Sequence, residues 1–246
     1  MLNLLRCEYV RMFRYSSFIK YTILTALFNL VCVFLSYCFG VYEGTAFNND
    51  STMLAGYVFM LLFAPIITSS FVGNEFSNGT MRNKLISGKQ HYQILLADFI
   101  VCLSTIVLLN LFGLLISYIV GGIVSTMPCE HKLYELLLNF AYSIVFFAVL
   151  TALYLFISLT VQNHSKGNIL SILAGFLLMI SPIFLVIPGK IYDVASTIGR
   201  YLPSTNLYKL IVYNTDNIAR YSICSAFAAV LLIGTGIFAF RKKNAN

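Results

Sequence analysis

The sequence has few charged residues for its length. Only 10% of its 246 residues are charged, whereas 59% are hydrophobic, and the mean hydropathy is +0.84. A soluble domain of this size cannot keep so much apolar side chain away from water, because too much of its surface faces solvent. The scarcity of charge therefore excludes a soluble globular protein and predicts a single all-α, polytopic membrane domain over residues 1–246.

Patterns that hold metals or disulfides are missing as well. The six cysteines form no C-x-x-C pair, and most fall inside apolar runs, where a thiol behaves as a small hydrophobic group. The histidines, His91, His131 and His164, form no H-E-x-x-H motif and are more typical of solvated loop residues than of ligands. We therefore predict no metal site, no cofactor and no catalytic residue in this chain.

Motifs that would power transport are also missing. Gly88-Lys89 lacks the rest of the G-x-x-x-x-G-K-[ST] loop that holds ATP phosphates. The carboxylates within predicted membrane helices, Asp98 and Glu135, lie near helix ends, whereas ion-coupled carriers place carboxylates near the midplane. Any active transport would therefore need an ATPase supplied by another subunit.

Six apolar stretches are long enough to cross a bilayer, which takes about 20 residues of helix. Their predicted bounds are residues 21–42, 53–72, 94–119, 133–161, 169–187 and 221–240. Backbone groups in lipid must bond within their own segment, so each stretch is predicted to be helical. Neutral polar residues inside them, such as Asn29 and Asn110, are more typical of contacts between helices than of ion sites.

Lysine and arginine are distributed unevenly around these stretches. With the N-terminus in the cytoplasm, eleven of the 16 fall on the cytoplasmic side, and four of the other five lie in one long outer segment, residues 188–220. This bias predicts that both termini are cytoplasmic. The basic residues flank apolar runs, so the net charge of +7 favours anionic lipid headgroups, and not nucleic acid, as a partner.

Residues 1–20 are predicted to form an interfacial helix. Its apolar face consists of Leu2, Leu5, Tyr9, Met12 and Phe13. Arg11 and Arg14 fall on the other face, near the headgroups of anionic lipids. A solvated leader is the alternative interpretation.

The cytoplasmic segment 73–92 mixes polar and apolar residues and is predicted to contain a short helix. Thr80 would cap it and Gly88 would end it. Met81, Leu85 and Ile86 would form its apolar side, with Arg82, Asn83 and Lys84 exposed. Such a helix offers a surface to another protein, although an ordinary connecting turn is the alternative.

The outer segment 188–220 has helix-like apolar spacing around a break at Pro203. Two short helices at or dipping into the outer leaflet would explain this spacing.

Residues 71–89, FVGNEFSNGTMRNKLISGK, resemble the coupling element of ABC-2 type transporter permeases from Gram-positive bacteria. The opening MLNLLRCEY is similar to the family's N-terminal interfacial helix, and YLPSTNL at residues 201–207 to the Leu-Pro after its fifth span. The stretch 90–92 departs from the family's pattern. The resemblance implies the ABC-2, type V exporter-like fold, with a cytoplasmic coupling helix and extracellular re-entrant helices between spans five and six.

The resemblance also implies roles for individual residues. Those that contact the ATPase or shape its docking element would be Glu75, Phe76, Gly79, Thr80, Arg82, Asn83, Lys84 and Leu85. A second contact would come from the loop holding Asn163, His164, Ser165 and Lys166. The extracellular gate would include Ile191, Ile198, Leu202, Pro203 and Leu207.

The function so implied is that of a permease subunit in a bacterial cell membrane. It would pair with a second permease half, as a homodimer, and with two copies of an ATPase that binds ATP and Mg. The apolar, aromatic-rich spans favour export of amphipathic substrates, with antimicrobial or toxin-like peptides as the first choice. The alternatives are an exporter of drugs or lipids, a membrane enzyme, and a non-transporting sensor or assembly subunit.

Overall fold

The computed structural model describes residues 1–14, 16–43, 56–124, 133–182, 197, 199–211 and 217–243. Within these residues the regular structure is helical and includes no strand. The helices are α1 (Leu2–Arg14), α2 (Ser16–Glu43), α4 (Gly56–Ser77), α5 (Thr80–Ile86), α6 (His91–Val124), α7 (Leu133–Val161), α8 (His164–Ile180), α10 (Pro203–Ile211) and α11 (Ile218–Lys243). The all-α prediction holds for this part of the chain.

Five helices are long and apolar enough to cross a membrane: α2, α4, α6, α7 and α11. They coincide with five of the six predicted spans. The predicted fifth span, residues 169–187, corresponds to α8, which is apolar but has only 17 residues. Residues 183–187 of that span lie outside the described residues.

Two predicted boundaries are wrong. The second span was expected to end at residue 72, but α4 continues to Ser77, so residues 73–77 are its last turns and not a loop. At the N-terminus, α1 ends at Arg14 and residues 16–20 open α2, so residues 1–20 are not one helix. In both places polar residues lowered the local hydropathy, although the backbone stays helical because helical hydrogen bonding does not require apolar side chains.

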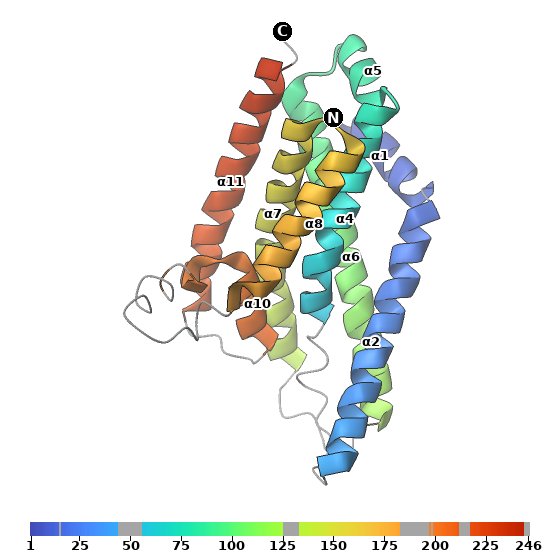
Figure 1. The fold of residues 1–246 in the computed structure, drawn as a ribbon, viewed down its shortest axis with the longest axis vertical. Coiled ribbons are helices and arrows are strands. Elements are labelled where there is room, and N and C mark those ends of the chain that lie inside the picture. Colours follow the sequence, from blue (N-terminus) through green and yellow to red (C-terminus); the bar gives the residue numbers. More distant parts are fainter. Residues whose placement is uncertain are drawn as a thin grey trace.

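The long helices form one bundle, with α4 surrounded by its neighbours (Figure 1). α4 packs against α8, α7 and α6, whereas α11 packs mainly on α7, and α2 mainly on α6. α4 is therefore mostly buried, while α2 and α11 expose most of their apolar surface. α5 lies at one end of the bundle, and the N-terminus and the end of α11 lie at the same end (Figure 1).

Helices α4 and α8 approach each other closely where α4 contains Pro65. A side chain at Gly175 of α8 would place its Cβ 2.8 Å from Pro65 Cγ and 2.9 Å from the carbonyl oxygen of Leu61. Proline has no N–H to donate to the carbonyl four residues earlier, so the Leu61 oxygen loses its helical partner. Only glycine allows α8 to lie against this opened turn.

Neutral polar groups join α2 to α6. Ser117 Oγ donates to Asn29 Oδ1 over 3.0 Å, and Asn29 Nδ2 donates to the Thr25 carbonyl over 2.8 Å. A Cβ at Gly113 would lie 2.6 Å from Asn29 Nδ2, so the glycine makes room for the amide. These contacts agree with the predicted role of Asn29 in joining helices.

Candidate functional site

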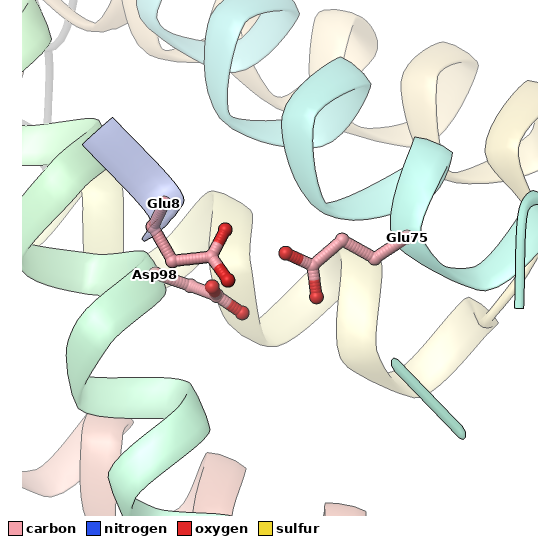
Figure 2. Close-up of side chains that lie close together, drawn as sticks. All are labelled: Glu8, Glu75 and Asp98. Atoms are coloured by element: carbon pink, nitrogen blue, oxygen red, sulfur yellow. The ribbon is translucent and has the colours of Figure 1, made fainter. Parts of the chain in front are cut away.

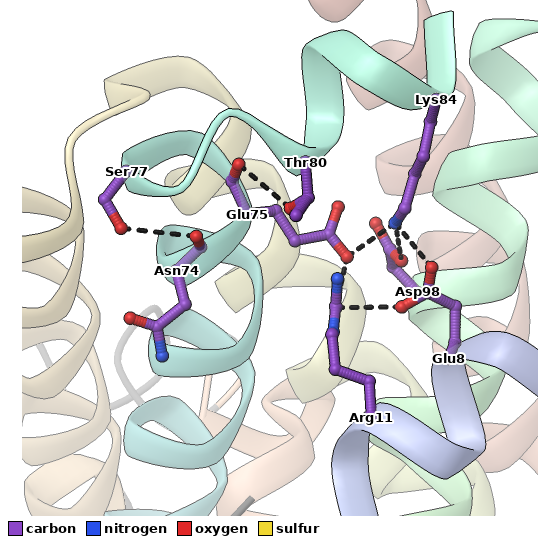
Figure 3. Close-up of polar contacts among 8 residues, drawn as sticks. All are labelled: Glu8, Arg11, Asn74, Glu75, Ser77, Thr80, Lys84 and Asp98. Atoms are coloured by element: carbon purple, nitrogen blue, oxygen red, sulfur yellow. Dashed lines mark hydrogen bonds and ion pairs between the residues drawn. The ribbon is translucent and has the colours of Figure 1, made fainter. Parts of the chain in front are cut away.

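Five charged side chains from four helices meet beside α5 (Figure 3). Lys84 of α5 is at the centre: its Nζ lies 2.6 Å from Glu75 Oε1, 2.7 Å from Glu8 Oε1 and 3.5 Å from Asp98 Oδ1. Arg11 completes the group by pairing with Glu8, at 2.9 Å, and with Glu75. We call these five residues the ion cluster; it ties α1, α4, α5 and α6 together.

The three carboxylates converge on one point (Figure 2). Glu8, Glu75 and Asp98 are each about 1% exposed, and one oxygen from each lies within 4.8 Å of the others. Three such carboxylates can hold a metal ion, but here the Lys84 ammonium lies between them and is the resident cation. The arrangement therefore works as a joint between helices.

Burial makes the joint interdependent. The cluster contains three acids and two bases, and Lys84 is the more buried base, so removing it leaves buried carboxylates short of a counter-charge. Breaking a buried ion pair in this way costs about 3–5 kcal/mol, because the remaining charge is unpaired. The five side chains are thus linked through shared ion pairs.

The electrostatics of the three residues outside the spans follow from this setting. Burial first, and then the neighbouring carboxylate of Glu75, raise the pKa of Glu8 above its ordinary value, against the opposing effect of Lys84 and Arg11. Burial alone would lower the pKa of Lys84, but Asp98, Glu75 and Glu8 raise it above its ordinary value. Burial would also lower the pKa of Arg11, but Glu75, Glu8 and Asp98 raise it above its ordinary value. Both bases therefore stay charged at neutral pH.

The inward face of helix α1 only partly matches the prediction: Met12 is buried and Leu5 and Tyr9 pack against the core, as predicted. Its buried residues are Leu4, Glu8 and Met12, spaced four apart, whereas Leu2 and Phe13 are exposed. Arg11, predicted to face lipid headgroups, points into the ion cluster, with its guanidinium 4.0 Å from the centre of the Phe71 ring. The prediction failed because Arg11 has partners on α4 that its own helix does not reveal.

The predicted short helix is present as α5, but its first turn differs from the prediction. The N-cap is Gly79, whose φ of 68° lies in the left-handed region that glycine adopts readily. Thr80 is not the cap; its Oγ1 donates to the Glu75 carbonyl over 3.2 Å. Gly88, with φ of 79°, ends the helix as predicted.

The two basic residues of α5 face opposite ways. Arg82 and Asn83 are exposed, as predicted, but Lys84 was expected to be exposed and its side chain is only 13% so. Glu75, in the last turn of α4, and Asp98, in the second turn of α6, turn Lys84 inward. α5 thus has a buried ionic side and a free side.

A hollow of about 530 Å³ opens beside the free side of α5. Its lining is Phe76, Ser77, Gly79, Met81, Arg82, Leu85 and Gln162. Of the predicted coupling residues, Phe76, Gly79, Arg82 and Leu85 therefore line it, whereas Glu75 and Lys84 belong to the ion cluster.

The segment after α7 lies against the same end of the bundle. Gln162 adopts φ of 53°, and Asn163 caps α8 by accepting from the Lys166 N–H over 3.2 Å. His164 packs on Gly73, where a Cβ would lie 3.0 Å from its ring. His164 and Lys166 are therefore the first turn of α8 and not a loop, and they lie near the α4 end that leads into α5.

The predicted gate residues lie elsewhere, at the C-terminal end of α8. Pro203 opens α10, Leu202 precedes it, and Leu207 is fully buried; Ile191 and Ile198 lie outside the described residues. Here the buried polar groups are neutral: Ser181 Oγ lies 2.7 Å from Ser204 Oγ and 3.2 Å from Thr205 Oγ1. None of these residues reaches the ion cluster.

Sequence reasoning missed two members of the ion cluster, Glu8 and Arg11, and gave no role to Asp98. A usable signal was present, since an acid inside an apolar helix, as Asp98 is in α6, implies a buried partner. Glu8 falls four residues after Leu4, on the stripe that α1 buries.

Comparison with protein families identifies the family of this chain. A family model described as ABC-2 family transporter protein matches residues 41–239, which is well over half of the chain. The match includes α4 to α8, α10 and most of α11, and hence Glu75, Lys84 and Asp98 of the ion cluster. The search of curated proteins found no match.

Proposed function

The chain belongs to the ABC-2 family of transporter membrane proteins, and we propose that it is the six-span permease subunit of an ATP-driven exporter of amphipathic peptides. It is a multi-pass, non-catalytic membrane subunit, and permeases of this family pair with ABC ATPase subunits. In our proposal, ATP and Mg bind in two copies of a separate ATPase, and the permease pairs with a second copy of itself.

The observation that carries the proposal is the position of α5. It is a helix of seven residues at the end of the bundle, exposed on one side and fixed on the other by Lys84, which pairs with three carboxylates (Figure 3). A push on the free side is transmitted to α1, α4 and α6 together, because they share one set of ion pairs. We propose that α5 is the coupling helix, with Arg82 and Asn83 facing the ATPase and Glu75 and Lys84 fixing the helix in place.

The course of the chain supports six crossings. α7 ends next to the hollow through Gln162, so the chain must return to the other end of the bundle before α11 can begin its run back. α8 is the helix that makes this return. We therefore propose that α8 forms the fifth crossing. We also propose that both termini are cytoplasmic, on the basis of the Lys and Arg bias, and that α10 belongs to an outer, re-entrant gate segment.

The cargo follows from the chemistry of the spans. The chain has 21 phenylalanines and 16 tyrosines. The described spans contain three carboxylates, Glu75, Asp98 and Glu135, and the first two are paired with Lys84. This composition suits cargo that partitions into the membrane, and peptides of the antimicrobial or toxin type are our first choice. Drugs or lipids are the second. A chain that binds the ATPase without moving cargo would be a sensor or assembly subunit.

The test is a cross-link from α5 to the ATPase. Asn83→Cys, exposed on α5, should form a cross-link to a co-expressed ABC ATPase, whereas Tyr134→Cys, exposed at the opposite end, should not. In vesicles holding the complex, ATP should drive uptake of a fluorescent amphipathic peptide, and Arg82→Ala should lower peptide-stimulated ATP hydrolysis. Efficient cross-linking from Tyr134→Cys alone would reject the docking assignment, and efflux of lipids or drugs only would reject the peptide.

A further inference from the structure

Acidic and basic side chains are segregated at the α5 end of the bundle. The acids described there, Glu8, Glu75 and Asp98, are all buried in the ion cluster. Five bases of the same end are exposed: Arg6, Arg14, Arg82, Lys166 and Arg241. Among the described residues, the surface of this end therefore has basic groups and no exposed carboxylate to neutralise them.

Arg82 is the exposed base nearest to a feature that can receive another molecule. It lines the hollow together with apolar side chains, including Phe76, Met81 and Leu85. No ion pair joins it to the part of the chain that the structure describes, since each acid of this end is already paired with Lys84 or Arg11. A guanidinium beside an apolar hollow fits a surface that carries a carboxylate next to an apolar side chain.

We propose that the ATPase surface that receives α5 is acidic, and that a carboxylate of the ATPase pairs with Arg82 while a neighbouring apolar side chain enters the hollow. This inference rests on the proposed role of α5 as the coupling helix. The permease already uses its three acids of this end within the ion cluster, so a carboxylate that pairs with Arg82 in the complex would come from the ATPase. Opposite charge across the contact also steers the two proteins together.

Anionic lipid headgroups are the competing partner for an exposed arginine. The geometry favours the ATPase, because α5 projects at the end of the bundle beyond the turn that follows Ser77, and its free side also presents Asn83 and Ser87. A helix embedded among lipids would present an apolar face there, whereas Ile86 is the one exposed large apolar residue of α5. Lipid contact remains an explicit outcome of the experiment.

The experiment measures the affinity of the ATPase for the full-length chain in lipid nanodiscs, using the ATPase that co-purifies with it. Arg82→Gln should weaken binding about three- to tenfold and Arg82→Glu more strongly, as expected for a charge at a contact. Raising the salt from about 0.05 M to about 0.5 M should weaken binding to the parent chain and have less effect on Arg82→Gln. Arg6→Gln and Arg6→Glu are the matched controls, because Arg6 is exposed at the same end but lines no part of the hollow.

A reciprocal arm identifies the acidic partner group. An Asp or Glu of the ATPase changed to Lys should restore binding to Arg82→Glu while weakening binding to the parent chain. Equal affinity of the parent and Arg82→Glu for the ATPase would overturn the proposal. The proposal would also be overturned if the Arg82 variants lost only binding to vesicles that contain anionic lipid, because Arg82 would then be a lipid contact. If the unmodified chain binds no ATPase and α5 forms no cross-link, the proposed function itself fails.

Discussion

The α5 end of the bundle and the region around α10 bury polar side chains of different kinds. At the α5 end, Lys84 and Arg11 pair with carboxylates, whereas near α10 the hydroxyl of Ser181 contacts those of Ser204 and Thr205. Neutral groups bond pair by pair, and the loss of Ser204 or Thr205 leaves the other bonded to Ser181. A buried charge depends on the counter-charges around it, so removing one charge of the ionic end should cost more stability than removing one hydroxyl of the neutral end.

The largest expected effect comes from removing the central charge of the ionic end. Lys84→Met keeps an unbranched side chain of similar volume but leaves three carboxylates with one arginine, so it should lower the free energy of unfolding by about 3–5 kcal/mol. Thermal unfolding in detergent measures this change. Arg82→Met is the matched control, two residues away on the same helix but exposed, and should change stability little. Equal losses in the two variants would contradict the assignment of Lys84 to a buried joint.

The next effect tests packing among neutral groups. Gly113→Ala would place a Cβ 2.6 Å from Asn29 Nδ2 and 3.2 Å from Thr25 Cγ2, so the amide must leave its bonds or α2 must move. The expected cost is about 1–3 kcal/mol, as for other overpacked sites. Gly122→Ala, with nothing within 4 Å of its Cβ, should be nearly neutral. A harmless Gly113→Ala would show that the approach of α2 to α6 is looser than described.

A smaller effect is expected near α10. Ser204→Ala removes one hydroxyl, but Ser181 keeps its contact with Thr205, so the loss should be about 1 kcal/mol. Thr235→Ala, which removes an exposed hydroxyl bonded only to its own helix, serves as the reference in the same unfolding assay. A loss as large as that of Lys84→Met would erase the contrast between the two regions.

The smallest effect is a dependence of stability on pH. Burial and Glu75 raise the folded-state pKa of Glu8 above its ordinary 4.5, so above pH 4.5 the folded chain binds more protons than the unfolded chain. The free energy of unfolding should therefore fall as the pH rises through that window, until Glu8 is ionised. The effect is modest because Lys84 and Arg11 oppose the shift. Unfolding measured across this pH range should have a shallower slope in Glu8→Gln, and identical slopes would refute the role of Glu8.

The sequence predicted the features that depend on local signals. Long apolar runs located α2, α4, α6, α7 and α11, and Gly88 marked the end of α5. Its pattern did not reveal which of the two bases of α5 turns inward, because that choice depends on Glu75 and Asp98 in neighbouring helices. Glu8 and Arg11 were missed for the same reason: α1 alone looks amphipathic, and its partners for an ionic face are more than sixty residues away in the chain.

The bend-prone turn of α4 at Pro65 has a mechanical consequence. α4 carries Gly56 at one end and Glu75 at the other. Because the Leu61 carbonyl lacks its helical hydrogen bond, the turn from Leu61 to Pro65 is where the helix axis bends most easily. Gly175 of α8 packs directly on this turn, so a bend of α4 there would pivot on the backbone of α8. A tilt of the part of α4 that carries Glu75 would therefore also displace α8, which packs against α10.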